Sequence, residues 1–271
     1  MWFARRILAV RATNPNLMAR ARHGGGWRWT VCWVSFGAAV VCAGAPRCPP
    51  EHTSAAAQRA AGERHLLLGS AADCAVAAAC FRAVLERVGD AQTRGEVSVL
   101  LADALEAGGD VAGAAAQLRR VHDEFPMSPV PPFKLGNQAR AAERWAEAAA
   151  HYEKAVSLAP TFINARTNLG MSLRGLNRLD DAIAAYHGAL VVAPARADVH
   201  VNLGVALDAA GKPEEARAAY EAGIRLDPLL YQGYFNLGVL LSESLKDREG
   251  GIRFYHAALR IAATNSQKSC I

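Results

Sequence analysis

The sequence lacks the motifs that mark most enzymes. It has no Gly-x-Ser-x-Gly turn for a nucleophilic serine, no glycine-rich phosphate loop and no His-Glu-x-x-His helix. Its six cysteines include no Cys-x-x-Cys pair, and no histidine stands at ligand spacing beside them, so we expect neither a metal centre nor another cofactor. The eight histidines are dispersed along the chain. The sequence therefore predicts a non-catalytic protein.

Acidic residues are absent from the first 50 positions. Residues 1–50 contain seven arginines and no lysine, aspartate or glutamate, whereas residues 51–271 carry 23 basic and 25 acidic side chains. The formal net charge of +5 therefore comes from this N-terminal leader. Because the rest of the chain offers no broad positive surface, we expect no nucleic-acid partner.

An uncharged stretch at residues 29–46 follows the arginines of the leader. A basic segment before an apolar one is typical of a secretory signal, and Ala43-Gly44-Ala45 supplies the small residues of a cleavage site. If it is not cleaved, this stretch just reaches across a hydrocarbon core of about 30 Å, which predicts a transmembrane helix and membrane attachment through 29–46. We expect a membrane or secretory location; an organellar presequence and a cytoplasmic protein without targeting are the alternatives.

Aromatic residues make up only 7% of the chain, yet they recur with a fixed period. The tripeptide Asn-Leu-Gly ends at Gly170, Gly204 and Gly238, and related tripeptides end at Gly136 and Ala102, all at one constant spacing. Five units of equal length thus run over residues 95–264. Three further positions and a closing proline keep this register: Ala114, Ala148, Ala182, Ala216 and Gly250; Leu118, Tyr152, Tyr186, Tyr220 and Phe254; Val121, Ala155, Ala189, Gly223 and Ala257; Pro126, Pro160, Pro194 and Pro228.

This pattern resembles the tetratricopeptide repeat, a helix-turn-helix unit of about 34 residues. The resemblance implies an all-α, right-handed α-solenoid of about five repeats, in which small residues let paired helices approach and the prolines end each second helix. Asp180, Pro213 and Asp247 are expected near helix starts.

The segments around the repeats are expected to be simpler. Residues 63–94 predict a degenerate capping repeat, in which 66–72 is too short and too broken by Gly and Ser for a full first helix. Residues 51–62 are expected to be a linker and 265–271 a tail. Cys74 and Cys80, six apart on one helix, cannot pair with each other easily and are expected to be small buried apolar residues.

A series of asparagines is the pattern that goes beyond packing. In this family the groove is lined by positions 2, 5, 6, 9 and 12 of the first helix. Position 6 holds Asn168, Asn202 and Asn236, and position 9 of the preceding unit holds Asn137. A carboxamide both donates and accepts, so such a ladder can pair with successive peptide groups of an extended chain. It resembles the asparagine ladder of O-GlcNAc transferases; the alternative is that these side chains are only solvated.

Positive charge near this ladder comes from Lys134 and Arg174. Repeats that bind the C-terminal carboxylate of chaperones use a clamp of Lys, Asn, Asn, Lys and Arg. Here only Asn137 and Asn168 match, because Phe133, Asp198 and Asn202 occupy the cationic positions and Asp198 would repel a carboxylate. The sequence therefore disfavours binding of a chaperone tail.

The resemblance implies a protein-interaction scaffold that binds an extended peptide or a partner helix in its concave groove. One alternative is a substrate-recognition arm related to O-GlcNAc transferase that works with a separate catalytic chain. Another is a membrane-tethered assembly factor. Since solenoids need a polar cap and little chain follows Thr264, we also expect the last second helix to expose Phe254 and Leu259. This face is expected to stack on a second copy, a partner or a missing C-terminal extension.

Overall fold

The computed structural model describes residues 30–32, 40–42, 48 and 53–268, and the side chains of Cys48 and residues 53–264. The chain divides into two units, Met1–Arg47 and Cys48–Ile271. In the first unit, β1 (Thr30–Cys32) pairs antiparallel with β2 (Val40–Cys42), and Val31 lies opposite Val41.

The predicted transmembrane helix over 29–46 is not supported. Among the described residues no helix is both long and apolar enough to cross a membrane. Thr30–Cys32 and Val40–Cys42 are strands, and their Thr and Val side chains, branched at Cβ, favour extended backbone. The rest of 29–46, including the predicted cleavage site, lies outside the described residues.

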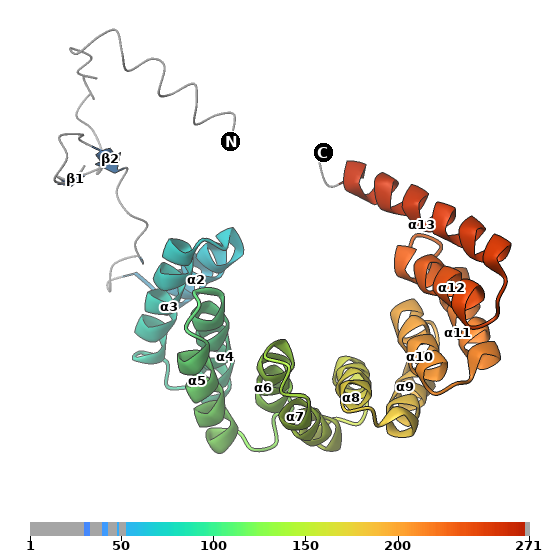
Figure 1. Cartoon of the computed structure of the whole chain (residues 1–271). Helices are drawn as coiled ribbons and strands as arrows, with labels where there is room; N and C mark the ends of the chain where they lie inside the picture. Colours follow the sequence, from blue (N-terminus) through green and yellow to red (C-terminus); the bar gives the residue numbers. More distant parts are fainter. Residues whose placement is uncertain (1–29, 33–39, 43–47, 49–52, 269–271) are drawn as a thin grey trace, which may run out of the picture. The chain divides into compact units, whose positions relative to one another are not determined.

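The second unit is an all-α solenoid, which confirms the predicted fold class. Helices that are neighbours in sequence pack against each other as successive pairs, and the pairs follow one another along an arc (Figure 1). The helices are α2 (Ala55–Leu68), α3 (Ala71–Leu85), α4 (Ala91–Ala107), α5 (Val111–Glu124), α6 (Val130–Ala141), α7 (Trp145–Leu158), α8 (Ile163–Gly175), α9 (Leu179–Val192), α10 (Ala197–Ala209), α11 (Pro213–Leu226), α12 (Tyr231–Glu243) and α13 (Arg248–Lys268).

The N-terminal pair is more complete than the sequence suggested. Helix α2 covers most of the predicted linker, because the Ser54 hydroxyl accepts a hydrogen bond from the Ala57 N–H at 3.2 Å and an alanine-rich segment follows. Gly69, with a φ of 71°, ends α2 as a left-handed cap, and Ser70 begins α3. The Gly and Ser that were expected to break the first helix therefore separate two full helices.

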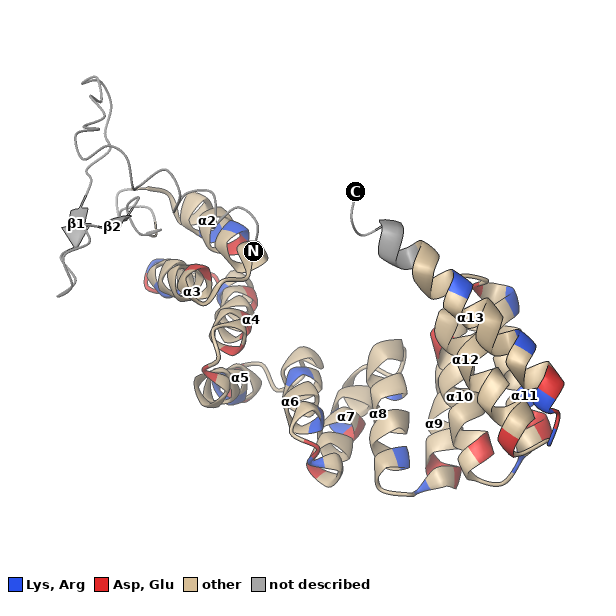
Figure 2. Ribbon diagram, turned by 45° about the horizontal axis from the view of Figure 1, so that its top comes forward, with Lys and Arg blue, Asp and Glu red and all other residues tan. Residues whose placement is uncertain are grey.

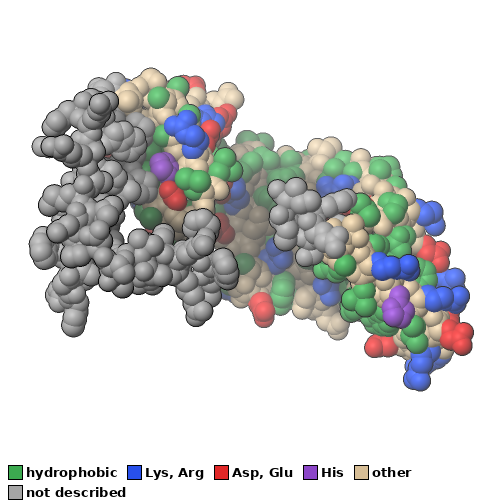
Figure 3. Space-filling view, turned by 90° about the horizontal axis from the view of Figure 1, so that it is seen from above, with side chains coloured by type: hydrophobic (Ala, Val, Ile, Leu, Met, Phe, Trp, Pro, Cys, Tyr) green, Lys and Arg blue, Asp and Glu red, His purple; other side chains and the backbone are tan. Residues whose placement is uncertain are grey.

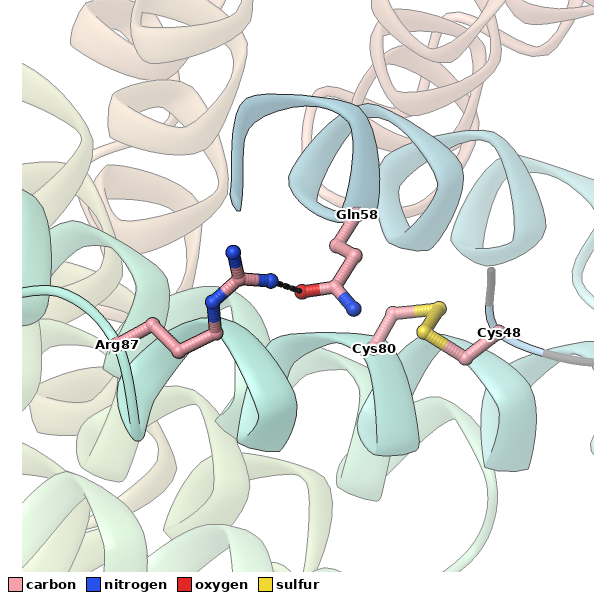
Figure 4. The surroundings of a disulfide bond; sticks show 4 residues. All are labelled: Cys48, Gln58, Cys80 and Arg87. Carbon is pink, nitrogen blue, oxygen red and sulfur yellow. Dashed lines mark hydrogen bonds between the residues drawn. A yellow bond between two sulfur atoms is a disulfide. The ribbon is translucent and has the colours of Figure 1, made fainter. Parts of the chain in front are cut away.

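A disulfide joins Cys48 to Cys80 on α3, with their Cα atoms 5.1 Å apart (Figure 4). Cys80 is buried, but the prediction that it is merely a small apolar residue was wrong; Cys74 is the buried free thiol. The true partner lies well upstream of Cys80, outside the repeats. Beside the disulfide, the Arg87 guanidinium donates to the Gln58 Oε1 at 3.3 Å, which ties α2 to the end of α3.

The repeating glycines and tyrosines pack on each other. A Cβ atom added to Gly136, Gly170 or Gly204 would lie 2.6–2.7 Å from a ring carbon of the tyrosine on the second helix of the same pair. Those tyrosines are almost fully buried: Tyr152, Tyr186 and Tyr220. Only glycine allows the ring to lie this close to the first helix, so the Gly and Tyr periodicity of the sequence reports one packing contact repeated three times.

The last unit departs from the predicted register by one residue. The left-handed residue of each earlier turn recurs once per unit at a constant spacing, at Gly109, Glu143, Asn177 and Gly211, but the last one is Lys246, one residue late. Helix α13 is therefore shifted: Tyr255 rather than Phe254 lies on Gly238, and Ala258 is buried where Ala257 was expected. Phe254 is partly buried against the core and was wrongly expected to be exposed, whereas Leu259 is 66% exposed, as expected. The helix also continues through the predicted tail to Lys268.

Candidate peptide-binding groove

The first helices of the repeats form the inner side of the arc (Figure 1). Successive first helices contact one another directly, α6 with α8, α8 with α10 and α10 with α12. No contact of similar extent joins successive second helices in the described part of the chain. Elements on the inside of a curve lie closest together, so α6, α8, α10 and α12 provide the surface that an extended ligand would meet.

Two asparagines of the predicted ladder bind each other. The Asn168 Nδ2 donates to the Asn137 Oδ1 at 3.0 Å, and the Tyr152 hydroxyl donates to the same oxygen at 2.8 Å. The Asn168 Nδ2 also lies 3.4 Å from the Tyr152 hydroxyl. This network joins α6, α7 and α8, so part of the hydrogen-bonding capacity assigned to a ligand stabilises the junction between two repeats.

The other two asparagines remain available. Asn202 on α10 and Asn236 on α12 are half-buried, and neither has a hydrogen-bond partner among the described residues. They hold the same register position on neighbouring helices. The structure thus separates the four predicted ladder residues into a paired couple and an unpaired couple.

The two predicted cations differ in the same way. The Lys134 Nζ lies 2.6 Å from the Asp103 Oδ1, an ion pair that links α6 to α4, with the two side chains 26% and 29% exposed. Arg174 is exposed on α8 and has no ion-pair partner among the described residues. Asp198, predicted to repel a carboxylate, is paired with Arg196 at 2.7 Å.

Buried tyrosines beneath the groove keep their protons. Burial raises the pKa of Tyr152 and of Tyr220, and it raises the pKa of Tyr186 to about 12. The Arg174 guanidinium opposes part of that rise at Tyr186. All three hydroxyls are therefore neutral donors at physiological pH.

A cavity of about 640 Å³, which the sequence did not predict, opens beside the N-terminal repeats. Most of the lining surface is apolar. The lining residues are Arg59, Glu63, Gln92, Gly95, Glu96, Val99, Leu100, Val121, Phe125, Ser128 and Val130. A signal was present, because Val99 and Leu100 fill groove positions 5 and 6 of the first unit, where the last three units have asparagine at position 6.

Apolar side chains are exposed at the C-terminal end of the solenoid, and Figure 3 shows them on that part of the surface. Phe235 and Ile252 are each 49% exposed, and the rings of Phe235 and Tyr255 lie 5.7 Å apart. Stacking of this end on a second copy or a partner stays a prediction, for which sedimentation velocity is the direct measurement.

No cluster of three metal-ligating side chains occurs within the described residues.

The helix pairs together define a helical-repeat solenoid whose inner surface is formed by the first helices. The family model described as tetratricopeptide repeat matches residues 64–129, 167–230 and 206–265, which together make up more than half of the sequence. The chain belongs to the tetratricopeptide-repeat family.

Solved structures of other repeat proteins share this fold. A structure of MamA is 24% identical, covers 62% of this chain and 97% of its own, and has a TM-score of 0.56. MamA from Desulfovibrio magneticus RS-1, from residue 41 to its end, is 18% identical with coverages of 63% and 96% and a TM-score of 0.57. YrrB, described as a TPR protein with an unusual peptide-binding site, is 19% identical with coverages of 67% and 91% and a TM-score of 0.54. At these identities the likeness shows the fold alone. No curated protein matches the chain in sequence, and the likeness to O-GlcNAc transferase stays a prediction.

Proposed function

We propose that this chain is a non-catalytic protein-interaction scaffold whose inner groove binds an extended peptide segment of a partner protein. The observation that carries the proposal is the unpaired couple Asn202 and Asn236, which hold the same register on α10 and α12. Each carboxamide can donate to a peptide carbonyl and accept from a peptide N–H, whatever the peptide's side chains. The described peptide-binding site of YrrB, a protein of the same fold, supports this assignment.

The test is peptide selection followed by measured affinity. A displayed library of random twelve-residue peptides would be selected on the full chain with its disulfide formed, and enriched peptides would be measured by fluorescence anisotropy. We expect dissociation constants in the micromolar range and a loss of at least tenfold in the double variant Asn202→Ala, Asn236→Ala. Each hydrogen bond to the peptide backbone is worth about 0.5–1.5 kcal/mol, which sets that expectation.

The matched control alters two polar side chains on second helices. His187→Ala and Glu214→Ala change exposed residues of α9 and α11 and should leave peptide affinity unchanged. Equal affinity of the asparagine variant and the native chain, with helicity preserved in both, would move the binding site elsewhere. Failure of the library to yield any specific peptide would contradict the proposal as a whole.

The compartment is a separate proposal, which rests on the disulfide. Structural disulfides persist in oxidising compartments, and Cys48 and Cys80 are bonded although Cys74 stays a thiol. Together with the basic and apolar leader, this favours a secretory or periplasm-like location. Alkylation of the native protein before reduction, followed by mass spectrometry, should label Cys74 only after unfolding and neither Cys48 nor Cys80. Labelling of all three would argue for a reducing compartment. The roles as a glycosyltransferase arm and as an assembly factor stay predictions.

A further inference from the structure

The charges of the first helices are arranged in three zones (Figure 2). Helices α6 and α8 contain Lys134, Arg140, Arg166 and Arg174 and no acidic residue. On one side α4 carries Glu96, Asp103 and Glu106 against a single arginine. On the other side α10 carries Asp198 and Asp208 and no lysine or arginine, and α12 has only Glu243. The first helices of the central repeats therefore carry only positive side chains, and those of the flanking repeats carry mainly negative ones.

Two of the four central cations are already used within the fold. Lys134 is paired with Asp103, as described above. The Arg166 Nε donates to the Pro160 carbonyl at 2.8 Å, which fixes that side chain near the start of α8. Arg140 and Arg174 differ, because neither has an acidic partner among the described residues. They occupy the same position of neighbouring repeats.

Hydrogen-bond donors near this arginine pair lack acceptors. The Arg140 Nε is buried without a hydrogen-bond partner in the described structure. The buried Tyr186 hydroxyl has Arg174 beside it as a donor, but no acceptor for its own proton. In the preceding repeat the equivalent Tyr152 hydroxyl donates to Asn137, but Met171 takes the place of that asparagine beside Tyr186. Buried donors without an acceptor cost free energy. An anion that accepted hydrogen bonds from them would gain this free energy in addition to that of its ion pairs with exposed charges.

We propose that the centre of the groove recognises an acidic segment of the bound peptide, with Arg140 and Arg174 pairing with its carboxylates. This rests on the proposed peptide-binding function and specifies its ligand. A guanidinium binds a carboxylate in a planar, two-bond geometry that an ammonium does not offer. Three acidic residues of the flanking helices are already in ion pairs, Asp103 with Lys134, Glu96 with Arg59 and Asp198 with Arg196. The arginine pair therefore sets the preference for a short acidic stretch.

The probes are two eight-residue peptides that are acetylated and amidated, so that no terminal carboxylate is present. One carries glutamate at two alternate central positions, which places both carboxylates on the same side of an extended chain about 7 Å apart. The other carries glutamine there. We expect the full chain to bind the glutamate peptide about five- to tenfold more tightly, and this ratio to fall as salt is raised because exposed charges are screened.

The decisive variant is the double substitution Arg140→Gln, Arg174→Gln. It should reduce the glutamate-to-glutamine ratio to about one while the affinity for the glutamine peptide stays the same. The control is Arg144→Gln, Arg178→Gln, which removes two arginines with the same spacing from the following turns, where they pair with Glu147 and Asp181. The control should keep the native ratio, and circular dichroism should show that all variants retain their helices.

Three outcomes would overturn the inference, and the first two separate it from the proposed function. Equal binding of both peptides to the native chain would reject the acidic preference while leaving peptide binding in place. Binding of neither peptide up to millimolar concentration would reject both. An equal loss of preference in the control variant would also overturn it, because net charge rather than the arginine pair would then explain the effect.

Discussion

The two halves of the solenoid bury their apolar side chains in different ways. From α7 to α12 one continuous cluster of buried residues extends from Ala149 to Leu241 and includes Tyr186 and Tyr220. Helices α2–α7 instead contain three separate clusters, around Phe81, Leu118 and Tyr152. One repeat pattern thus produces a continuous core in one half and a divided core in the other.

Polar and covalent links compensate for the divided core in the N-terminal half. The disulfide to Cys80 fastens the chain before α2, and the Asp103–Lys134 pair joins α4 to α6. Between α5 and α6 the chain contains Pro126 and Pro129, and the cavity of about 640 Å³ lies beside this junction. In a repeat array each unit is stabilised by its immediate neighbours, so a weak junction divides the array into parts that can unfold separately.

The largest effect should come from the continuous core. The substitution Tyr220→Ala removes the side chain of a residue that is 2% exposed and leaves a cavity. We therefore expect the free energy of unfolding to fall by about 3–5 kcal/mol. Urea unfolding followed by circular dichroism measures the loss. Hydrogen exchange should show protection falling together over α8–α12 and persisting in α2–α5. Tyr231→Ala, at a tyrosine that is 43% exposed, is the control and should cost far less. A local loss of protection confined to α11 would contradict a continuous core.

Reduction of the disulfide should have the next largest effect, and in the other half. Opening the Cys48–Cys80 link frees the chain before α2, and closure of a loop of this size is worth about 3.7 kcal/mol. Thermal unfolding with and without a reductant should show this loss, with exchange protection decreasing in α2–α4 and unchanged in α8–α12. The Cys48→Ser variant should show the loss without reductant and no further change with it. Faster exchange throughout the chain after reduction would mean that the two halves unfold as one.

The sequence predicted the repeat fold because each repeat depends on local contacts. Gly170 and Tyr186, for example, lie within one helix pair, and equivalent glycines and tyrosines recur with the same spacing, so their packing could be inferred without three-dimensional knowledge. In the last unit the predicted packing was wrong. There the turn at Lys246 has one extra residue, and the sequence keeps Gly250 and Phe254 in the old register. Periodicity alone could not reveal that Tyr255 replaces Phe254.

The groove was predicted less completely, because its chemistry depends on distances between repeats. Asn137 and Asn168 belong to different repeats, and only the angle between neighbouring helix pairs brings their side chains to 3.0 Å. The disulfide was missed for a related reason, since Cys48 lies outside the repeats and its partner is set by how the chain approaches α3. The candidate residues predicted from the sequence lie on the first helices, but packing decides which of them already have hydrogen-bond or ion-pair partners.

A third, smaller effect should come from the ion pair across the weak junction. Lys134→Met removes the charge but keeps most of the aliphatic stem, leaving the part-buried Asp103 unpaired, and should destabilise the chain by about 1 kcal/mol. The urea midpoint is the measurement, and exchange in α4 and α6 should increase before that in α10. Lys154→Met, at an exposed residue of α7, provides a charge-matched control. Identical midpoints for the two variants would show that the Asp103 link does not support the junction.

The smallest effect belongs to a single ion pair on the C-terminal half, and pH should reveal it. Hydrogen bonding to Arg196 lowers the pKa of Asp198, so the carboxylate is more easily ionised in the folded chain than in the unfolded chain. Its stabilisation is therefore present above the ordinary carboxyl pKa of about 3.9 and is lost as pH falls through the lowered folded value. Because the pair is partly exposed, we expect Asp198→Asn to cost about 0.5 kcal/mol at pH 7, and the difference from the native chain to shrink at pH 3. Asp180→Asn, at a side chain that is 94% exposed, should give little difference at either pH. A cost of several kcal/mol for Asp198→Asn would mean that this half, too, depends on polar links, and the contrast between the halves would fail.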